Sequence, residues 1–293
     1  MTQALNLVLG GVFHAAALFL VAAGLQLVFG VQKILNLACG SFYALGAYTG
    51  IAAVNAALAA GVPAPLFLPV LVASGLALGV LGPPLERLLR TIYDRDEAFQ
   101  LLLTFALVLM LEDVIRFVWG AAPYQMAGVY LTYGQVRLGI ATVPVYNFIV
   151  IAAGLAIAAG MGLLLTRSRF GGIVRAAAEN RGMAQALGVD MGRISTRVFT
   201  LGLVLGTVGG ALVIPAGAAV NEMAIELIVE AFAVVVIGGL GSMRGAFVGA
   251  LVVGVLKAVA IAVYPEAEML AVYLIVIAVL LFRPTGLFAR ATA

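Results

Sequence analysis

Long uninterrupted apolar stretches constrain the fold of this chain more than any other feature. They lie at about residues 4–29, 41–60, 66–81, 98–119, 144–165, 198–215, 227–264 and 269–282. About 20 apolar residues are enough for a helix to cross the hydrocarbon core of a bilayer. The stretches are continuous rather than alternating, which argues against strands that face lipid on one side only. The sequence therefore predicts an all-α polytopic membrane protein.

The composition excludes the alternative of a soluble protein. Hydrophobic residues make up 64% of the chain and charged residues only 10%, against about 25% charged in soluble domains. The net charge of +3 is not a nucleic-acid signal, because the basic residues cluster in the predicted loops. A single cysteine, Cys39, excludes an internal disulfide.

The basic residues predict the orientation in the membrane. Three arginines fall in the predicted loop 83–97, six basic residues fall in residues 167–197, and two arginines follow the last stretch. The loops on the opposite side carry only Arg137. Because basic loops stay in the cytoplasm, we expect a cytoplasmic C-terminus, an outside N-terminus and an odd number of crossings.

The stretch at residues 227–264 is too long for one span. A glycine-rich run, Gly238 to Gly245, interrupts it near the middle, so it forms either two spans or a re-entrant pair. This gives about eight to nine transmembrane segments with one broken or re-entrant pair. We expect a single transmembrane domain over residues 1–293.

Residues 167–197 form a polar island between two apolar stretches and hold six of the chain's sixteen Lys and Arg residues. Gly171-Gly172 can end one helix, strong helix formers continue from Ile173 to Leu187, and Gly188 suits the position after a helix end. Composition allows two interpretations, an amphipathic helix along the membrane or a solvated linker with a helical turn. A helical wheel puts Arg175, Glu179 and Gly182 on one side, and Ile173, Ala177, Ala184 and Leu187 on another.

The island resembles the coupling segment of branched-chain amino-acid ABC-importer permeases, the LivH-like family. The matching string is GIVRAAAENRGMAQALGVD, residues 172–190. Four further blocks look like that family in the same order, at residues 24–30, 36–48, 238–242 and 283–288. One departure is Cys39, where a histidine is common in the family, so no role of that histidine carries over.

The resemblance implies a permease subunit in a bacterial inner membrane, part of an ATP-driven importer for branched-chain or other small amino acids. Its implied partners are a second and usually different permease, two ATP-binding subunits and a periplasmic binding protein, within membrane lipid and without nucleic acid. ATP would be hydrolysed by the separate subunits, and the chain itself has no P-loop motif. The residues that the resemblance puts against the ATPase are Arg175, Ala178, Glu179, Leu187 and Gly188.

Two polar or glycine-rich interruptions are candidates for lining the translocation path, since broken helices recur in transporters. Alternatively, the first is a simple turn at the membrane interface, and the second is a site of close helix packing. The candidates are Gln32, Asn36, Ser41, Gly238, Gly239, Gly241 and Ser242.

Glu230 and Lys257 are predicted to form an intramembrane ion pair. Lys257 lies about 11 residues into its predicted segment, roughly 17 Å along a helix and so near mid-membrane. A charge there normally has a partner, and Glu230 is the leading one, in a structural or a substrate-binding role. His14 is alone in its apolar segment and is expected to be a core residue without a paired acid.

The rival function is a self-sufficient secondary transporter or channel for a small solute. It would use Glu230, Lys257 and Glu112 as core ionisable groups, and it leaves the polar island without a role. An enzyme is not expected, because one His and one Cys assemble neither a nucleophile–base pair nor a metal cluster. The sequence predicts no cofactor, metal site or catalytic residue.

Overall fold

The computed structural model describes residues 2–93, 95–126, 129–138, 141–264, 268–282 and 286–288. Its α-helices are α1 (Thr2–Gln32), α2 (Cys39–Ala59), α3 (Phe67–Ala77), α4 (Gly82–Arg90), α5 (Glu97–Trp119), α6 (Val129–Thr132), α7 (Val145–Arg167), α8 (Arg169–Glu179), α9 (Arg181–Ala186), α10 (Met191–Val213), α11 (Met223–Gly238), α12 (Met243–Val263) and α13 (Glu268–Phe282). Short 3-10 turns are η1 (Ala64–Leu66), η2 (Leu78–Leu81) and η3 (Ile214–Ala216). Four short strands are β1 (Tyr124–Gln125), β2 (Gln135–Leu138), β3 (Ala141–Pro144) and β4 (Ala218–Ala219).

The helices agree with the predicted all-α polytopic membrane class. Six helical segments of the described residues are long and apolar enough to cross a membrane, at residues 7–32, 39–59, 67–90, 145–167, 191–216 and 243–263. The strands form two small antiparallel pairs, β1 with β4 and β2 with β3. The sequence did not predict these strands, because they lie in short loop segments between helices.

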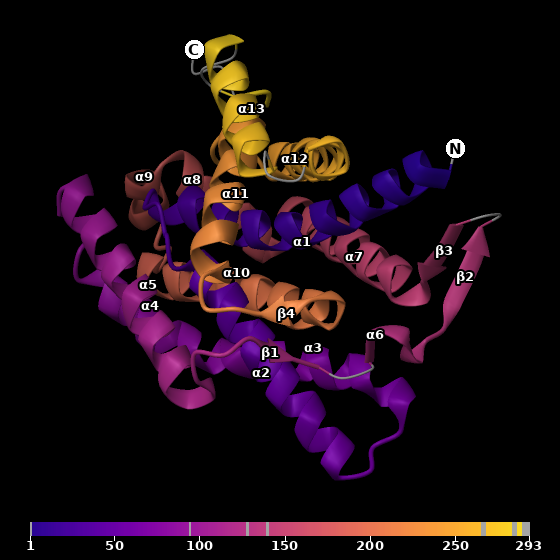
Figure 1. The fold of residues 1–293 in the computed structure, drawn as a ribbon. Helices are drawn as coiled ribbons and strands as arrows, with labels where there is room; N and C mark the ends of the chain where they lie inside the picture. The colour runs from indigo at the N-terminus through magenta and orange to yellow at the C-terminus, as the bar shows by residue number, and fades with distance from the viewer. Residues whose placement is uncertain are drawn as a thin grey trace.

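Helices α1 and α10 form the centre of the bundle (Figure 1). Of the six apolar segments, theirs are the most buried, at 72% and 78% of the apolar window. Helices α2, α11 and α12 pack around this pair, while α5, α7 and α13 lie further out. Because other helices surround α1 and α10, neither needs a wide polar face, and both are apolar over most of their length.

Small residues let the central helices approach closely. A Cβ at Gly46 of α2 would collide with the carbonyl oxygen of Thr207 in α10, and a Cβ at Gly210 of α10 would collide with that of Tyr43. Thr207 itself is buried and donates its hydroxyl to the carbonyl of Gly75 in α3, 2.8 Å away. Tight glycine contacts are typical of membrane helices, which have no hydrophobic drive towards each other within lipid.

Replacing Gly46 with alanine is expected to destabilise the bundle by about 1–3 kcal/mol, the usual cost of overpacking a tight contact. The reason is that the new methyl group meets the backbone of α10, which cannot rotate away. The thermal unfolding midpoint in detergent measures the effect. Gly160→Ala in α7 is the control, because nothing lies within 4 Å of a Cβ there. Equal midpoints for the two variants would contradict the close contact.

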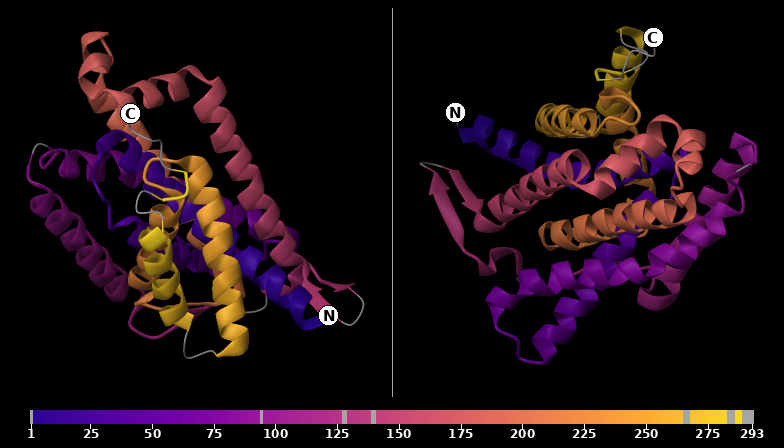
Figure 2. Two further views of the ribbon diagram at one scale, coloured as in Figure 1. Left: turned by 90° about the horizontal axis from the view of Figure 1, so that it is seen from above. Right: turned by 180° about the vertical axis from the view of Figure 1, so that it is seen from behind.

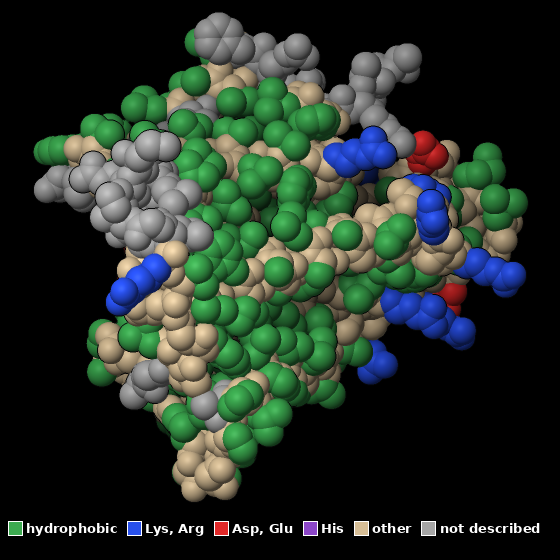
Figure 3. All heavy atoms as spheres, turned by 90° about the vertical axis from the view of Figure 1, so that its right-hand side faces the viewer, with side chains coloured by type: hydrophobic (Ala, Val, Ile, Leu, Met, Phe, Trp, Pro, Cys, Tyr) green, Lys and Arg blue, Asp and Glu red, His purple; other side chains and the backbone are tan. Residues whose placement is uncertain are grey.

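The two ends of the bundle differ in chemistry. Helices α4, α8 and α9 lie at one end, called the basic end below, whereas the β2–β3 hairpin lies at the other, called the hairpin end (Figure 2). In Figure 3 most of the Lys and Arg side chains in view gather along one side of the molecule, and hydrophobic side chains cover its middle.

Two sequence-based boundaries change in the structure. Residues 83–97, predicted as a loop, include helix α4, which continues α3 through the turn η2, so Arg87 and Arg90 are helical. The long stretch 227–264 does divide at the glycine-rich run, into α11 and α12. Lys257 is therefore the fifteenth of the 21 residues of α12, closer to its C-terminal end than the predicted mid-membrane position.

Candidate functional site

The polar island folds as two short helices between α7 and α10. Ser168 ends α7 and caps α8, because its hydroxyl accepts a hydrogen bond from the Gly171 amide at 2.9 Å. The prediction that Gly171-Gly172 ends a helix is wrong, since both glycines lie inside α8. A Cβ at Gly171 would collide with the backbone of the last turn of α7, so this glycine permits the sharp change of direction.

A second break divides the helix predicted over residues 173–187. Asn180 has an extended backbone and caps α9, accepting a hydrogen bond from the Met183 amide at 2.9 Å. Asp190 caps α10 in the same way, accepting from the Arg193 amide at 3.1 Å. Gly188 has a φ of 85° and follows the end of α9, as its sequence position predicted.

One face of α8 and α9 packs on the bundle and the other is exposed. Val174, Ala177 and Ala184 are buried in the main hydrophobic core, which also contains Met161 of α7 and Met191 of α10. The buried face holds the two short helices against the long ones. The pair therefore forms a compact element attached to both α7 and α10.

The residues predicted to contact an ATPase lie mainly on the exposed face. Arg175, Glu179, Leu187 and Gly188 are exposed, while Ala178 is half-buried. Leu187 was assigned to the same side of the wheel as Ala177, yet 78% of its surface is exposed, because the break at Asn180 turns α9 relative to α8. Met183, which sequence reasoning missed, is 60% exposed. Two large apolar side chains four positions apart are thus exposed, Met183 in α9 and Leu187 directly after its last residue.

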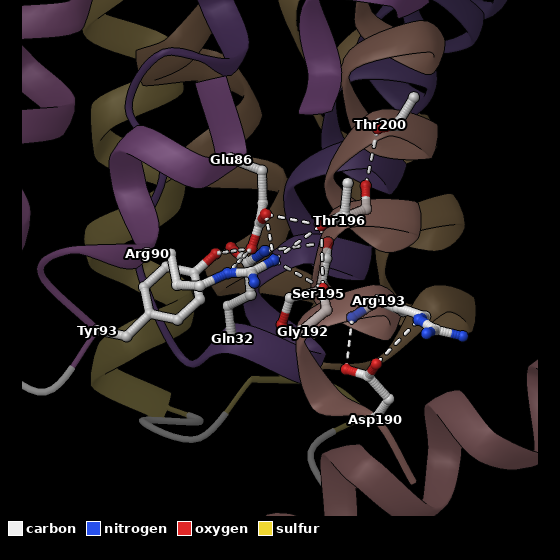
Figure 4. A network of polar contacts seen from close by, with 10 residues as sticks. All are labelled: Gln32, Glu86, Arg90, Tyr93, Asp190, Gly192, Arg193, Ser195, Thr196 and Thr200. Carbon is white, nitrogen blue, oxygen red and sulfur yellow. Dashed lines mark hydrogen bonds and ion pairs between the residues drawn. The ribbon is translucent and has the colours of Figure 1, made fainter. Parts of the chain in front are cut away.

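A buried carboxylate connects α4 to the start of α10 (Figure 4). Glu86 is 0% exposed and accepts hydrogen bonds from Arg90 at 3.1 and 2.6 Å, from the Thr196 hydroxyl at 2.7 Å and from the Tyr93 hydroxyl at 3.1 Å. Arg90 also donates to the carbonyl of Gly192 at 2.8 Å. The Glu86 network, meaning these five residues, therefore joins α4 to the first turns of α10.

Both carboxylate oxygens of Glu86 accept two hydrogen bonds each. Burial raises the pKa of the Tyr93 hydroxyl above its ordinary value, and the negative charge of Glu86 raises it further. Tyr93 therefore stays protonated and donates. The sequence offered little signal for this network, because Glu86 directly precedes Arg87 in a charged segment and is typical of a solvated loop residue.

A cavity of about 300 Å³ opens at the basic end beside α8. The end of α1, the start of α5 and the α8–α9 junction line it, with Gln32, Glu97, Ala178, Glu179 and Arg181 among the lining residues. The Arg181 guanidinium lies over the Tyr93 ring, 5.8 Å from its centroid. The α8–α9 element thus contacts α1 as well as α7 and α10, and it contacts Tyr93 in the segment before α5.

The first set of predicted path residues lies at the junction of α1 and α2. Gln32 donates to the carbonyl of Ser195 in α10 at 3.3 Å. The Asn36 side-chain oxygen accepts from the Ala38 amide at 3.1 Å. The Asn36 amide nitrogen and the Ser41 hydroxyl are buried without a hydrogen-bond partner among the described residues. Unpartnered buried polar groups are rare, which distinguishes this junction from an ordinary turn.

The second set, the α11–α12 break at Gly238, Gly239, Gly241 and Ser242, is held by a residue that sequence reasoning missed. Gln26 of α1 is buried, donates to the Gly239 carbonyl at 2.9 Å and accepts from the Gly241 amide at 2.5 Å. Ser242 caps α12 through the Gly245 amide at 3.1 Å. One glutamine side chain therefore satisfies both sides of the break.

The C-terminal block also contacts this break. The Leu287 amide donates to the Ile237 carbonyl at 2.8 Å, and the Phe288 amide donates to the Gly238 carbonyl at 3.2 Å. Residues 283–285 of the block lie outside the described residues. The last carbonyls of α11 are satisfied by these two amides, as helix ends require in an apolar environment.

Three ionisable side chains meet between α1, α11 and α12. Lys257 donates to one carboxylate oxygen of Glu230 at 2.6 Å, and His14 contacts the other at 2.8 Å. The structure thus brings the predicted pair together, while the expectation that His14 has no acidic partner is wrong. Glu230 is 8% exposed. Across the described residues, no group of three His, Cys, Asp or Glu side chains is arranged to hold a metal ion.

Comparison with known proteins gives one matching family. The pattern of the family described as "Branched-chain amino acid transport system / permease component" matches residues 7–282. This range contains α8 and α9, the Glu86 network and the α11–α12 break.

Individual relatives match over nearly the whole chain. The permease protein BraD of a high-affinity branched-chain amino acid transport system, from Pseudomonas aeruginosa, is 27% identical over 92% of this chain and 91% of its own. The corresponding protein LivH of Escherichia coli is 26% identical over 96% and 94%. A solved structure, PsaBC from Streptococcus pneumoniae in complex with Fab, has a TM-score of 0.48 and 12% identity, covering 93% of this chain and 89% of that one.

The family pattern extends over far more than half of the chain. The chain therefore belongs to the family of permease components of branched-chain amino acid transport systems.

Proposed function

We propose that the chain is the permease subunit of an ATP-driven importer for branched-chain or other small amino acids, and that α8 and α9 receive the motion of a separate ATPase. The observation that carries this proposal is the exposed apolar pair Met183 and Leu187. The pair lies in α9 and directly after its end, and the neighbouring helix α8 is packed on the bundle. An exposed apolar patch on a rigid polar element is typical of a docking surface.

The topology that supports this role has nine spans, formed by α1, α2, α3–α4, α5, α7, α10, α11, α12 and α13. With the basic end in the cytoplasm, the N-terminus lies outside, and the C-terminus lies inside. The acidic residues Glu222 and Glu226 then face outward, where a periplasmic binding protein would approach. The implied assembly has a second permease, usually a different chain, and two ATPase subunits in a bacterial inner membrane.

The translocation path in this proposal passes the α1–α2 junction and the α11–α12 break. Asn36 and Ser41 support it, because the Asn36 amide nitrogen and the Ser41 hydroxyl are buried and have no hydrogen-bond partner among the described residues. The break contributes only if it can open, since Gln26 now occupies both the Gly239 carbonyl and the Gly241 amide. The conformational change of an importer could supply that opening.

Replacing Leu187 with aspartate is expected to reduce ATP-driven amino-acid uptake at least about tenfold, because a charge enters the centre of the apolar patch. Uptake and ATPase activity in proteoliposomes that contain the complete transporter measure the effect. Gln185→Asp is the control, since Gln185 is exposed two residues away, in the last turn of α9, and receives the same charge. Equal losses in both variants would contradict docking at Leu187. Uptake without any ATPase subunit would instead support a secondary transporter.

A further inference from the structure

Helix α5 lies along one side of the bundle and is attached through a single face (Figure 1). The buried residues of α5 face the core; they are Thr104, Leu107, Val108, Leu111 and Ile115. Most of the remaining surface is exposed and apolar over the whole length of the helix. The large exposed side chains are Phe99, Leu101, Leu102, Phe105, Leu109, Met110, Val114, Phe117 and Val118.

A carboxylate interrupts this exposed face towards its hairpin end. Asp113 is exposed and lies four, seven and eleven residues after Leu109, Ala106 and Leu102, which form one stripe along a helix. Phe117, 91% exposed, follows one turn later on the same stripe. Within the part of the chain that the structure describes, Asp113 has no hydrogen bond or ion pair.

Lipid alone is an unsuitable neighbour for this stripe. Asp113 lies 16 residues after Glu97, about 24 Å along the helix, and six residues before Trp119, about 9 Å from the other end. An unpaired carboxylate at that depth is costly in hydrocarbon, and such groups normally face protein or a water-filled path. The exposed faces of α7 and α13 contrast with it, because α7 is charged only at Arg167 and α13 only at Glu268.

We propose that the exposed face of α5, the stripe from Leu102 to Phe117, packs against the second permease subunit of the transporter. The partner then presents a basic or hydrogen-bond-donating side chain opposite Asp113. This inference rests on the proposed function, because that function supplies the second permease.

The charge on the exposed face of α5 favours a different permease chain as its partner over a second copy of this chain. Near its hairpin end the face carries Glu112, Asp113 and Arg116, two acids and one base, so its net charge is −1. Arg116 is already paired with Glu112 at 2.6 Å. In a symmetric pair about an axis along the membrane normal, equivalent residues lie at equal depth, so two copies packed through this stripe would bring their two net-negative α5 ends near each other. Repulsion of like charges disfavours that pair, and a partner with a surplus base relieves it.

Site-specific photocross-linking in membranes with the complete transporter tests the surface. A photoreactive amino acid at Leu109 is expected to form a cross-link whose second chain mass spectrometry identifies as another permease of this family. The same probe at Leu155, 53% exposed on α7, is expected to give lipid adducts only. Cross-links of Leu109 to a second copy of this chain, or to lipid alone, would overturn the proposal.

Charge reversal gives an independent test. Asp113→Lys is expected to lower the amount of second permease that co-purifies with the full chain at least about tenfold, and Asp113→Asn less strongly. Glu222→Lys is the control, as it makes the same charge change at an exposed acid outside the face. If co-purification of the second permease is unchanged while the ATPase subunit still co-purifies with the wild type, the α5 interface is contradicted and the proposed function is not. Absence of the ATPase from the wild-type complex would instead count against the proposed function.

Discussion

Replacing Glu86 with alanine is expected to destabilise the protein by about 3 kcal/mol and to reduce coupled transport at least about tenfold. Removal of one partner from a buried ion pair costs about 3–5 kcal/mol, because the other charge is left uncompensated. The lower end applies here, since the Arg90 side chain is 42% exposed and can turn to water. Unfolding in detergent and uptake in proteoliposomes measure the two effects.

The functional part of this expectation follows from where the Glu86 network lies. Thr196 and Gly192 belong to the first turns of α10, which begins five residues after α9 ends. Glu86 and Arg90 belong to α4, which continues into the span of α3. A displacement of α8 and α9 would therefore reach the α3–α4 segment through this network. Without the carboxylate, α10 and α4 can move separately.

Two variants separate coupling from stability in the Glu86 experiment. Glu86→Gln keeps the volume but only one acceptor oxygen, which can replace the Oε1 that accepts from Tyr93 or the Oε2 that accepts from Thr196, but not both. We therefore expect an intermediate loss of stability, about 1.5–3 kcal/mol. Arg87→Gln removes an exposed charge from the adjacent position of α4 and is expected to change neither quantity. If Glu86→Gln retained full coupling at reduced stability, the network would be structural only.

Features that depend on local sequence were predictable. The apolar stretches predicted the long helices, and the glycine-rich run predicted the division between α11 and α12. Gly188 predicted the end of α9. Each of these follows from hydrophobic length or from a backbone conformation that glycine favours. The capping residues Ser168 and Asn180 carry a comparable signal, since Ser and Asn commonly start helices. The role of Asn180 was missed because the helix formers around it favoured one longer helix, and that of Ser168 because Gly171-Gly172 was interpreted as the helix end.

Features that depend on contacts across the bundle were not predictable. Gln26 and the α11–α12 break are separated by more than 200 residues, as are His14 and Glu230. Glu86 meets Thr196 from 110 residues away. A single buried polar residue in an apolar segment predicts that a partner exists, but its identity depends on helix packing. The pair Glu230 and Lys257 could be predicted, because α11 and α12 are consecutive in the chain.

Replacing Lys257 with methionine is expected to destabilise the bundle by about 3–5 kcal/mol. Glu230 is buried, and its carboxylate loses the 2.6 Å contact with the ammonium group while it keeps only the contact with His14. The loss of folded protein in detergent, followed by size-exclusion chromatography and thermal unfolding, measures the effect. Leu256→Met is the control, because this neighbouring residue of α12 is 37% exposed and apolar.

The double variant Lys257→Met with Glu230→Leu decides what the three ionisable residues contribute. Removing both charges also removes the cost of burying them, so it is often neutral or stabilising where each single change is harmful. We therefore expect the double variant to recover most of the stability lost in Lys257→Met. If recovered stability comes with recovered uptake, the cluster serves only to join α1, α11 and α12. If stability returns but uptake does not, the charges themselves act in transport, and Glu230 becomes a candidate for contact with the substrate. A double variant as unstable as Lys257→Met would contradict the ion pair as the source of the loss.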